Sequence, residues 1–179
     1  MKLFGSLAVA VLLGMSLAGC ARERNQMKSD TPRTLIFSRA GVSLAVGDEW
    51  QYSNLDSSHT LRPPTLVSQA GTLCILLLPP DRSEPRMVAE GLHTLVVNDR
   101  QAARHSFSRQ ELFGTSGLRI IYVSYAQQAE RDGRPVEFQN RHYLLKNRDG
   151  RCVAIKYLAR AGGDADSVHR MILGSLALQ

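Results

Sequence analysis

The chain has 179 residues, and its 22 basic and 16 acidic side chains give a formal net charge of +6. The basic residues are spread along the chain, and around Arg100, Arg104 and Arg109 the only interleaved aromatic residue is Phe107. This pattern lacks the alternation of aromatic and basic residues expected of a surface that binds nucleic acid, and we exclude that class of partner.

The first 19 residues have the pattern of a signal peptide. Lys2 supplies a positive charge, and the uncharged run from Leu3 to Leu17 is too short to span a bilayer comfortably. The tetrapeptide Leu17-Ala18-Gly19-Cys20 resembles the lipobox of bacterial lipoproteins, in which a peptidase cuts before a cysteine that is then acylated. We therefore expect residues 1–19 to be removed and Cys20 to carry the lipid anchor, the alternative being a secretory signal with an incidental cysteine.

The segment 20–33 is predicted to be a polar tether. It is rich in charge and contains a single large apolar residue, Met27. Ala21 follows the cysteine where some lipoproteins have aspartate, which favours the outer membrane over the inner one, with the domain facing the periplasm. Loss of Lys2 with the signal leaves a net charge of 21 − 16 = +5. Residues 34–179 are predicted to form one domain, long enough to bury a continuous core.

The first half of this domain predicts strands and one helix. Leu35–Phe37 and Val42–Val46 indicate a hairpin, and a turn at Gly47 then leads to Trp50. After a polar loop over 54–64, strands are expected at Leu66–Gln69 and Thr72–Leu78, the second with a central position in the sheet. Helical spacing over Glu84–Asn98 places Val88, Leu92 and Leu95 on one face, with Ser83 as the cap.

The second half predicts long hairpins and a final helix. Strands are expected at Ser106–Phe113 and Leu118–Tyr125, followed by a polar loop over Gln127–Pro135. A hairpin of Val136–Leu145 and Cys152–Leu158, joined by a turn at 147–150, is the strongest strand signal. A helix capped by Asp164 should run to about Leu178 and lay its apolar stripe on the sheet. Strands in hairpins with flanking helices make an α+β domain.

The order of these elements resembles the PsbP/Mog1-like fold. The resemblance rests on the early hairpin and tryptophan turn between Phe37 and Trp50, the central apolar strand, and the closing segment from Met171 to Leu178. Within that superfamily the chain is similar to DcrB-type envelope lipoproteins, which carry a lipobox and whose last helix runs into a strand-like end. The resemblance implies an antiparallel sheet flanked by helices, and binding or accessory roles in the envelope rather than catalysis.

Two cysteines remain once Cys20 is acylated. Cys74 and Cys152 both lie in apolar runs, and an oxidising compartment permits a disulfide between them if their strands are neighbours. The alternative is two separate buried thiols that behave as small hydrophobic side chains. The sequence leaves both open.

The residues show no catalytic or metal-binding signature. The five histidines are far apart and lack the spacing of metal ligands: His59, His93, His105, His142 and His169. Trp50 is expected to plug the core, with ligand stacking as an alternative in which Arg100 and Arg104 would assist. We expect no cofactor and no enzymatic activity.

The leading hypothesis is a membrane-anchored lipoprotein that binds another envelope protein. The alternatives are a module that binds a small molecule or lipid, and a hydrolase with a site assembled in space.

Overall fold

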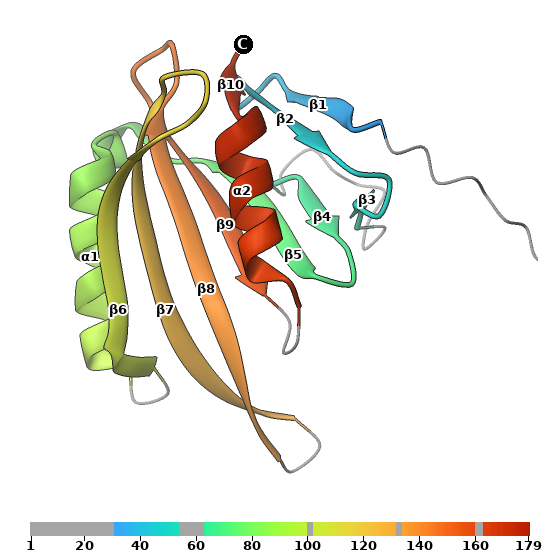
Figure 1. The fold of residues 1–179 in the computed structure, drawn as a ribbon. Helices are drawn as coiled ribbons and strands as arrows, with labels where there is room; N and C mark the ends of the chain where they lie inside the picture. Colours follow the sequence, from blue (N-terminus) through green and yellow to red (C-terminus); the bar gives the residue numbers. More distant parts are fainter. Residues whose placement is uncertain (1–30, 54–62, 100–101, 132–133, 160–162) are drawn as a thin grey trace, which may run out of the picture.

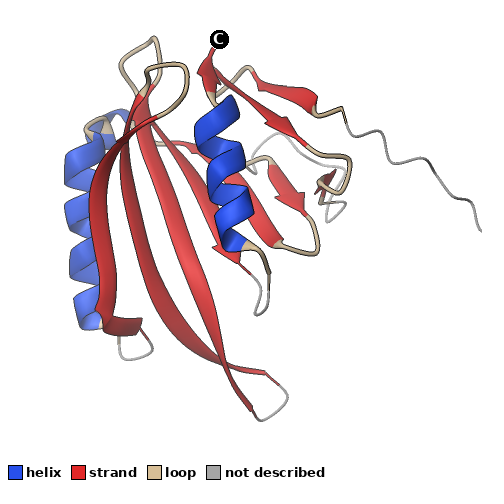
Figure 2. Cartoon of the chain, in the orientation of Figure 1, coloured by secondary structure: helices blue, strands red, loops and turns tan. Residues whose placement is uncertain are grey.

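The computed structural model describes residues 31–53, 63–99, 102–131, 134–159 and 163–179, which form two antiparallel sheets and two α-helices (Figures 1 and 2). The small sheet has the strand order β1-β2-β10, and the large sheet has the order β3-β4-β5-β9-β8-β7-β6. In chain order the elements are β1 (Arg33–Phe37), β2 (Val42–Val46), β3 (Gln51–Tyr52), β4 (Thr65–Val67), β5 (Gly71–Leu77), a 3₁₀ turn (Pro80–Arg82), α1 (Pro85–Asn98), β6 (Ala102–Phe113), β7 (Arg119–Arg131), β8 (Arg134–Lys146), β9 (Cys152–Ala159), α2 (Ala165–Ser175) and β10 (Ala177–Leu178). The predicted α+β class with helices flanking an antiparallel sheet is confirmed.

The large sheet separates two layers of apolar packing. On one face lie α2 and the small sheet, and the core there includes Leu44 of β2, Ile172 of α2 and Tyr143 of β8, none of which is exposed. On the other face α1 covers β6, β7 and β8, around Ala89 and Val123 (Figure 1). The central strands β5 and β9 place apolar side chains on both faces of the sheet, as predicted for β5, because successive residues of a strand point to opposite faces.

Strands β7 and β8 are longer than the sequence predicts. Of the polar stretch Gln127–Pro135, expected to be a loop, residues 127–131 and 134–135 continue the ladder, with Gln127 opposite Phe138 and Glu130 opposite Pro135. Here the sequence prediction was wrong because polar side chains remove the alternation of hydrophobicity while the backbone groups still pair.

Helix α1 begins and packs differently from the prediction. Its N-cap residue is Glu84, not Ser83, and makes no side-chain capping bond, while Pro85 occupies the first turn, where a missing N–H costs nothing. Leu95 is 67% exposed, whereas Ala89 and Val96 are buried. The stripe that packs on the sheet is therefore rotated away from Leu95.

Helix α2 confirms its predicted cap. The Asp164 carboxylate accepts a hydrogen bond of 2.8 Å from the Ser167 N–H. The helix ends at Ser175 rather than near Leu178, because Leu176 takes an extended conformation and its side chain enters the core. Ala177 and Leu178 then pair with β2, which gives the strand-like end that the family resemblance implies.

Within the described ranges, no helix is long and apolar enough to cross a membrane.

Candidate functional site

A groove of about 430 Å³ opens where the small sheet meets the edge of the large sheet. Its walls come from five places in the chain: β1 and its turn (36–40), Tyr52 of β3, the prolines at 63–64, β5 (75–77) and Arg151. Ile36 and Tyr52, which are 59% and 49% exposed, place apolar surface at its mouth. Concave apolar walls with a few polar groups are typical of binding sites.

The groove is basic. Arg39 and Arg151 both line it, and none of the residues that the structure places along its walls is acidic. The Arg151 guanidinium donates a 2.9 Å hydrogen bond from one terminal nitrogen to the Leu78 carbonyl, and its Nε is buried without a hydrogen-bond partner among the described residues. Arg151 therefore places positive charge beside apolar surface.

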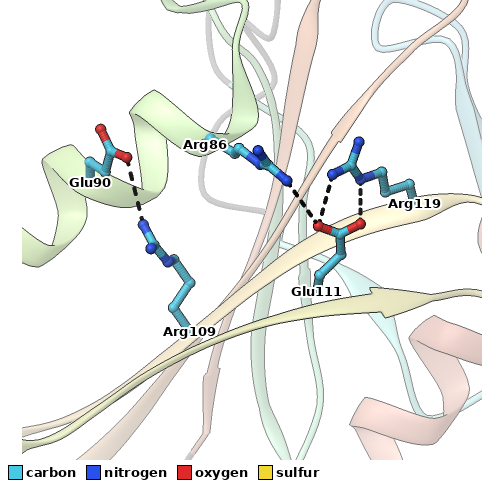
Figure 3. Close-up of polar contacts among 5 residues, drawn as sticks. All are labelled: Arg86, Glu90, Arg109, Glu111 and Arg119. Carbon is cyan, nitrogen blue, oxygen red and sulfur yellow. Dashed lines mark hydrogen bonds and ion pairs between the residues drawn. The ribbon is translucent and has the colours of Figure 1, made fainter.

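Three arginines near α1 contact carboxylates. On the sheet face that α1 covers, Glu111 of β6 accepts hydrogen bonds from both Arg119 and Arg86 (Figure 3). A terminal nitrogen of Arg109 lies 3.8 Å from a carboxylate oxygen of Glu90. The bonds from Arg119 and then Arg86 hold the pKa of Glu111 below its usual value. Arg86 and Arg109 join α1 to β6, and Arg119 joins β7 to β6, which indicates a structural role for all three.

Asn147 holds the β1–β2 turn, which forms one wall of the groove. Its Nδ2 donates a 3.2 Å hydrogen bond to the carbonyl of Ala40, and its Oδ1 accepts bonds from the N–H groups of Asp149 and Arg151. The side chain, 5% exposed, thus joins the β1–β2 turn to the β8–β9 turn. The same residue holds Ala40 and Arg151, which both line the groove.

Trp50, which the sequence offers as a ligand-stacking residue, does not line this groove. Trp50 is 1% exposed and packs edge to face on Tyr157, with ring centroids 6.3 Å apart. It occupies the core position that the sequence favoured, so its ring is not available for stacking on a ligand. Arg100 and the side chain of Arg104 lie outside the described residues, as does Cys20.

The two cysteines lie on neighbouring strands, yet both thiols are free. Cys74 is opposite Lys156, and Cys152 lies four positions farther along β9, or about 13 Å at the usual rise per residue. This exceeds the Cα separation of about 7 Å that a disulfide tolerates, so the register opposes a bridge. Burial raises the pKa of the Cys152 thiol to about 11 and also raises that of Cys74, as expected for unreactive thiols.

The histidines whose side chains the structure describes contact aromatic groups. His142 stacks on Tyr125 with a centroid distance of 5.7 Å, and Nδ1 of His169 lies 2.9 Å from the Tyr143 hydroxyl. Burial, with a smaller contribution from Lys156, lowers the pKa of His142 to about 4. His93 lies against Phe107. In the described part of the chain no three His, Cys, Asp or Glu side chains gather as metal ligands would.

Sequence reasoning missed the groove because its residues come from segments far apart in the chain. A signal for it was present in the apolar Ile36 and in Arg39, three positions apart in an early hairpin, but neither residue alone indicates a site. Arg151 and β5 join them only through tertiary packing.

No protein-family model and no curated protein matches this sequence. Solved structures do match its fold. A protein from Bacteroides thetaiotaomicron matches with a TM-score of 0.54 and 13% identity, over 83% of this chain and 49% of that one, so the chain spans about half the length of that protein. The solution structure of cyanobacterial PsbP (CyanoP) from Synechocystis matches with a TM-score of 0.51 and 10% identity, over 83% of this chain and 93% of that one.

A third match is weaker. LpqN of Mycobacterium tuberculosis, described as involved in cell envelope biogenesis, has a TM-score of 0.38 and 13% identity, over 79% of this chain and 84% of that one. A score of this size carries no argument about fold or function. The assignment to DcrB-type lipoproteins stays a prediction, while the first two structures confirm that this chain has the PsbP/Mog1-like fold.

Proposed function

We propose that this chain is a lipid-anchored protein of the bacterial envelope, whose domain binds another envelope component through the groove and performs no catalysis. The observation that carries the proposal is the groove itself, which combines apolar walls with the guanidinium group of Arg151. The lipobox at Cys20 supports the membrane address, and the polar segment 20–33 would let the domain stand off from the surface.

The membrane anchor is tested by changing the cysteine. Cys20→Ala should move the protein from the membrane fraction to the soluble fraction after cell lysis, because stable anchoring depends on its acyl chains. Cys74→Ala is the matched control, since it removes a cysteine of the folded domain and should leave the protein with the membranes. A Cys20→Ala protein that stays in the membrane fraction after a high-salt wash contradicts the anchor.

Binding through the groove is tested in intact cells with a photoreactive amino acid. Placed at Ile36, it should form adducts with an envelope component. Placed at Phe113, which is 65% exposed on β6 and does not line the groove, it should form none. Equal adducts at both positions, or none at Ile36, would contradict groove-mediated binding.

A second candidate ligand follows from the same chemistry. Apolar walls beside Arg151 suit an amphiphile with an anionic head group as well as a protein. In this case the purified protein should retain an anionic lipid detectable by mass spectrometry, and Arg151→Gln should reduce the amount retained. Protein free of any lipid would remove this candidate.

A further inference from the structure

We propose that two copies of this chain pair through residues 109–113 of strand β6, which joins their large sheets into one continuous sheet. The partner is a second copy in the antiparallel register that places Arg109 of one copy opposite Glu111 of the other. None of these residues lines the groove, so this inference does not depend on the proposed function.

Strand β6 forms an edge of the large sheet. It is the last strand in the sheet order, and in the described part of the chain it pairs only with β7 (Figure 1). Over residues 109–113 this pairing is regular, because the register shift lies earlier, between Ala103 and Ser108. All residues of this stretch except Leu112 are exposed. An edge without a proline or a bulge is open to pairing with another strand.

The gaps in the described domain do not fall opposite this stretch. By the register, the gap at 100–101 adjoins the other end of β6, and the gap at 132–133 joins β7 to β8 beyond Arg131. The gaps at 54–62 and 160–162 follow β3 and β9, and at least two strands separate those strands from β6.

The backbone polar groups of Arg109, Glu111 and Phe113 point out of the sheet. The N–H of the next residue, Gly114, donates a 2.9 Å hydrogen bond to the Leu118 carbonyl, so Gly114 points toward β7. Polar groups of successive strand residues alternate in direction. The even-numbered residues of the stretch therefore bond to β7, whereas the N–H and C=O groups of the three odd-numbered residues face outward and have no strand beside them in the described chain.

The charges along this edge are complementary to a second copy. Arg109 and Glu111 lie on one face of β6, the face that α1 covers (Figure 3). In an antiparallel pair centred on Gln110, each Arg109 lies opposite the Glu111 of the other copy, and each of these residue pairs exchanges both backbone hydrogen bonds. The neighbouring registers place two arginines or two glutamates directly opposite each other, which is destabilising. Charge therefore selects the register centred on Gln110, with the two-fold symmetry usual in dimers.

The side chains at this edge retain accessible surface beside their contacts within one copy. The side chain of Arg109 is 49% exposed, with its nitrogen 3.8 Å from the Glu90 carboxylate, and that of Glu111 is 35% exposed. Phe113 is 65% exposed at the end of the strand. A second strand along this edge would cover apolar surface as well as pair the charges.

Cysteine cross-linking of the full-length acylated protein in intact cells tests the pairing. Opposite Cα atoms of a non-hydrogen-bonded pair, such as Gln110 with its copy, are about 4.5 Å apart, which a disulfide can span. Gln110→Cys should therefore give a disulfide-linked dimer on a non-reducing gel. Ser108→Cys is the matched control, because in this register the two copies of residue 108 are four positions apart, or about 13 Å, and should not be linked.

Charge reversal tests the register. Arg109→Glu places a glutamate opposite Glu111 of the other copy and should raise the dissociation constant of the dimer about tenfold, measured by light scattering of the protein in detergent. Adding Glu111→Arg restores opposite charges in the same register and should recover the dimer. Circular dichroism checks folding, and if the double variant is unfolded, Gln110→Cys and its control still decide.

Several results would overturn the inference. These are no dimer from Gln110→Cys, equal cross-linking from Gln110→Cys and Ser108→Cys, a link from Gln110→Cys to a different protein, and a folded double variant that stays monomeric. Groove binding survives each of these results, because the photoreactive residue at Ile36 tests it separately. At Phe113 a photoreactive residue should react with a second copy of this chain, an adduct of twice the chain's mass, and with no other envelope component.

Discussion

Replacing Asn147 by alanine should destabilise the domain more than its position in a surface turn suggests. The side chain is 5% exposed and makes three hydrogen bonds, one to the Ala40 carbonyl and two from backbone N–H groups in its own turn. Alanine would leave these groups without partners, and Ala40 itself is 4% exposed. Water therefore has little access to replace the lost bond between the turns.

The expected loss follows from the number of bonds and their burial. A buried polar group that loses its partner costs about 1–3 kcal/mol, and a bond that solvent replaces costs nearer 0.5–1.5 kcal/mol. The Ala40 carbonyl belongs to the first class and the two N–H groups to the second, so the unfolding free energy should fall by about 2–6 kcal/mol. For a domain of this size that lowers Tm by roughly 10 °C.

Urea denaturation followed by circular dichroism measures this change. Asp149→Ala is the matched control, because Asp149 is exposed in the same turn and only its backbone N–H bonds to Asn147. The control should change stability by less than about 0.5 kcal/mol. A loss below about 1 kcal/mol in Asn147→Ala would show that Asn147 does not join the two turns as described.

Three further predictions concern stability. His142 has a pKa of about 4 in the folded protein against 6.5 unfolded, so the unfolded state binds the extra proton between these values. The unfolding free energy should therefore fall by about 3 kcal/mol as pH drops from 6.5 to 4. Urea titrations at the two pH values should show a smaller fall for His142→Phe. Equal falls in the two proteins would contradict the lowered pKa of His142. Asp164→Ala should lose about 1 kcal/mol by urea titration through loss of the α2 cap, and Asp164→Asn clearly less; equal losses would contradict the cap. Gly71→Ala would place its Cβ 2.2 Å from the Leu158 carbonyl oxygen and should lower Tm. Gly91→Ala on α1, where a Cβ meets nothing within 4 Å, should raise Tm. The reverse order of the two Tm values would contradict the packing described around these glycines.

Local chemistry made much of the fold predictable. The hairpin of β1 and β2, the turn before β9 and the Asp164 cap each depend on residues close together in sequence, and each appears as expected. The sequence predictions were wrong where the local hydrophobic pattern was absent or fitted more than one structure. The polar ends of β7 and β8 look like loops because neither face is apolar, and Leu95 fits a helical stripe that tertiary packing rotates out of the core.

The sequence by itself determined the α+β class, the position of most strands, the candidate lipidation site at Cys20 and the pair of cysteines that a bridge could join. Tertiary structure decided the remaining features, because these features depend on strand register and on contacts between distant segments. Register separates Cys74 from Cys152 on paired strands, and packing buries Trp50. Only the assembled sheets bring Ile36, Leu77 and Arg151 to one groove, since no spacing in the sequence records that these residues meet.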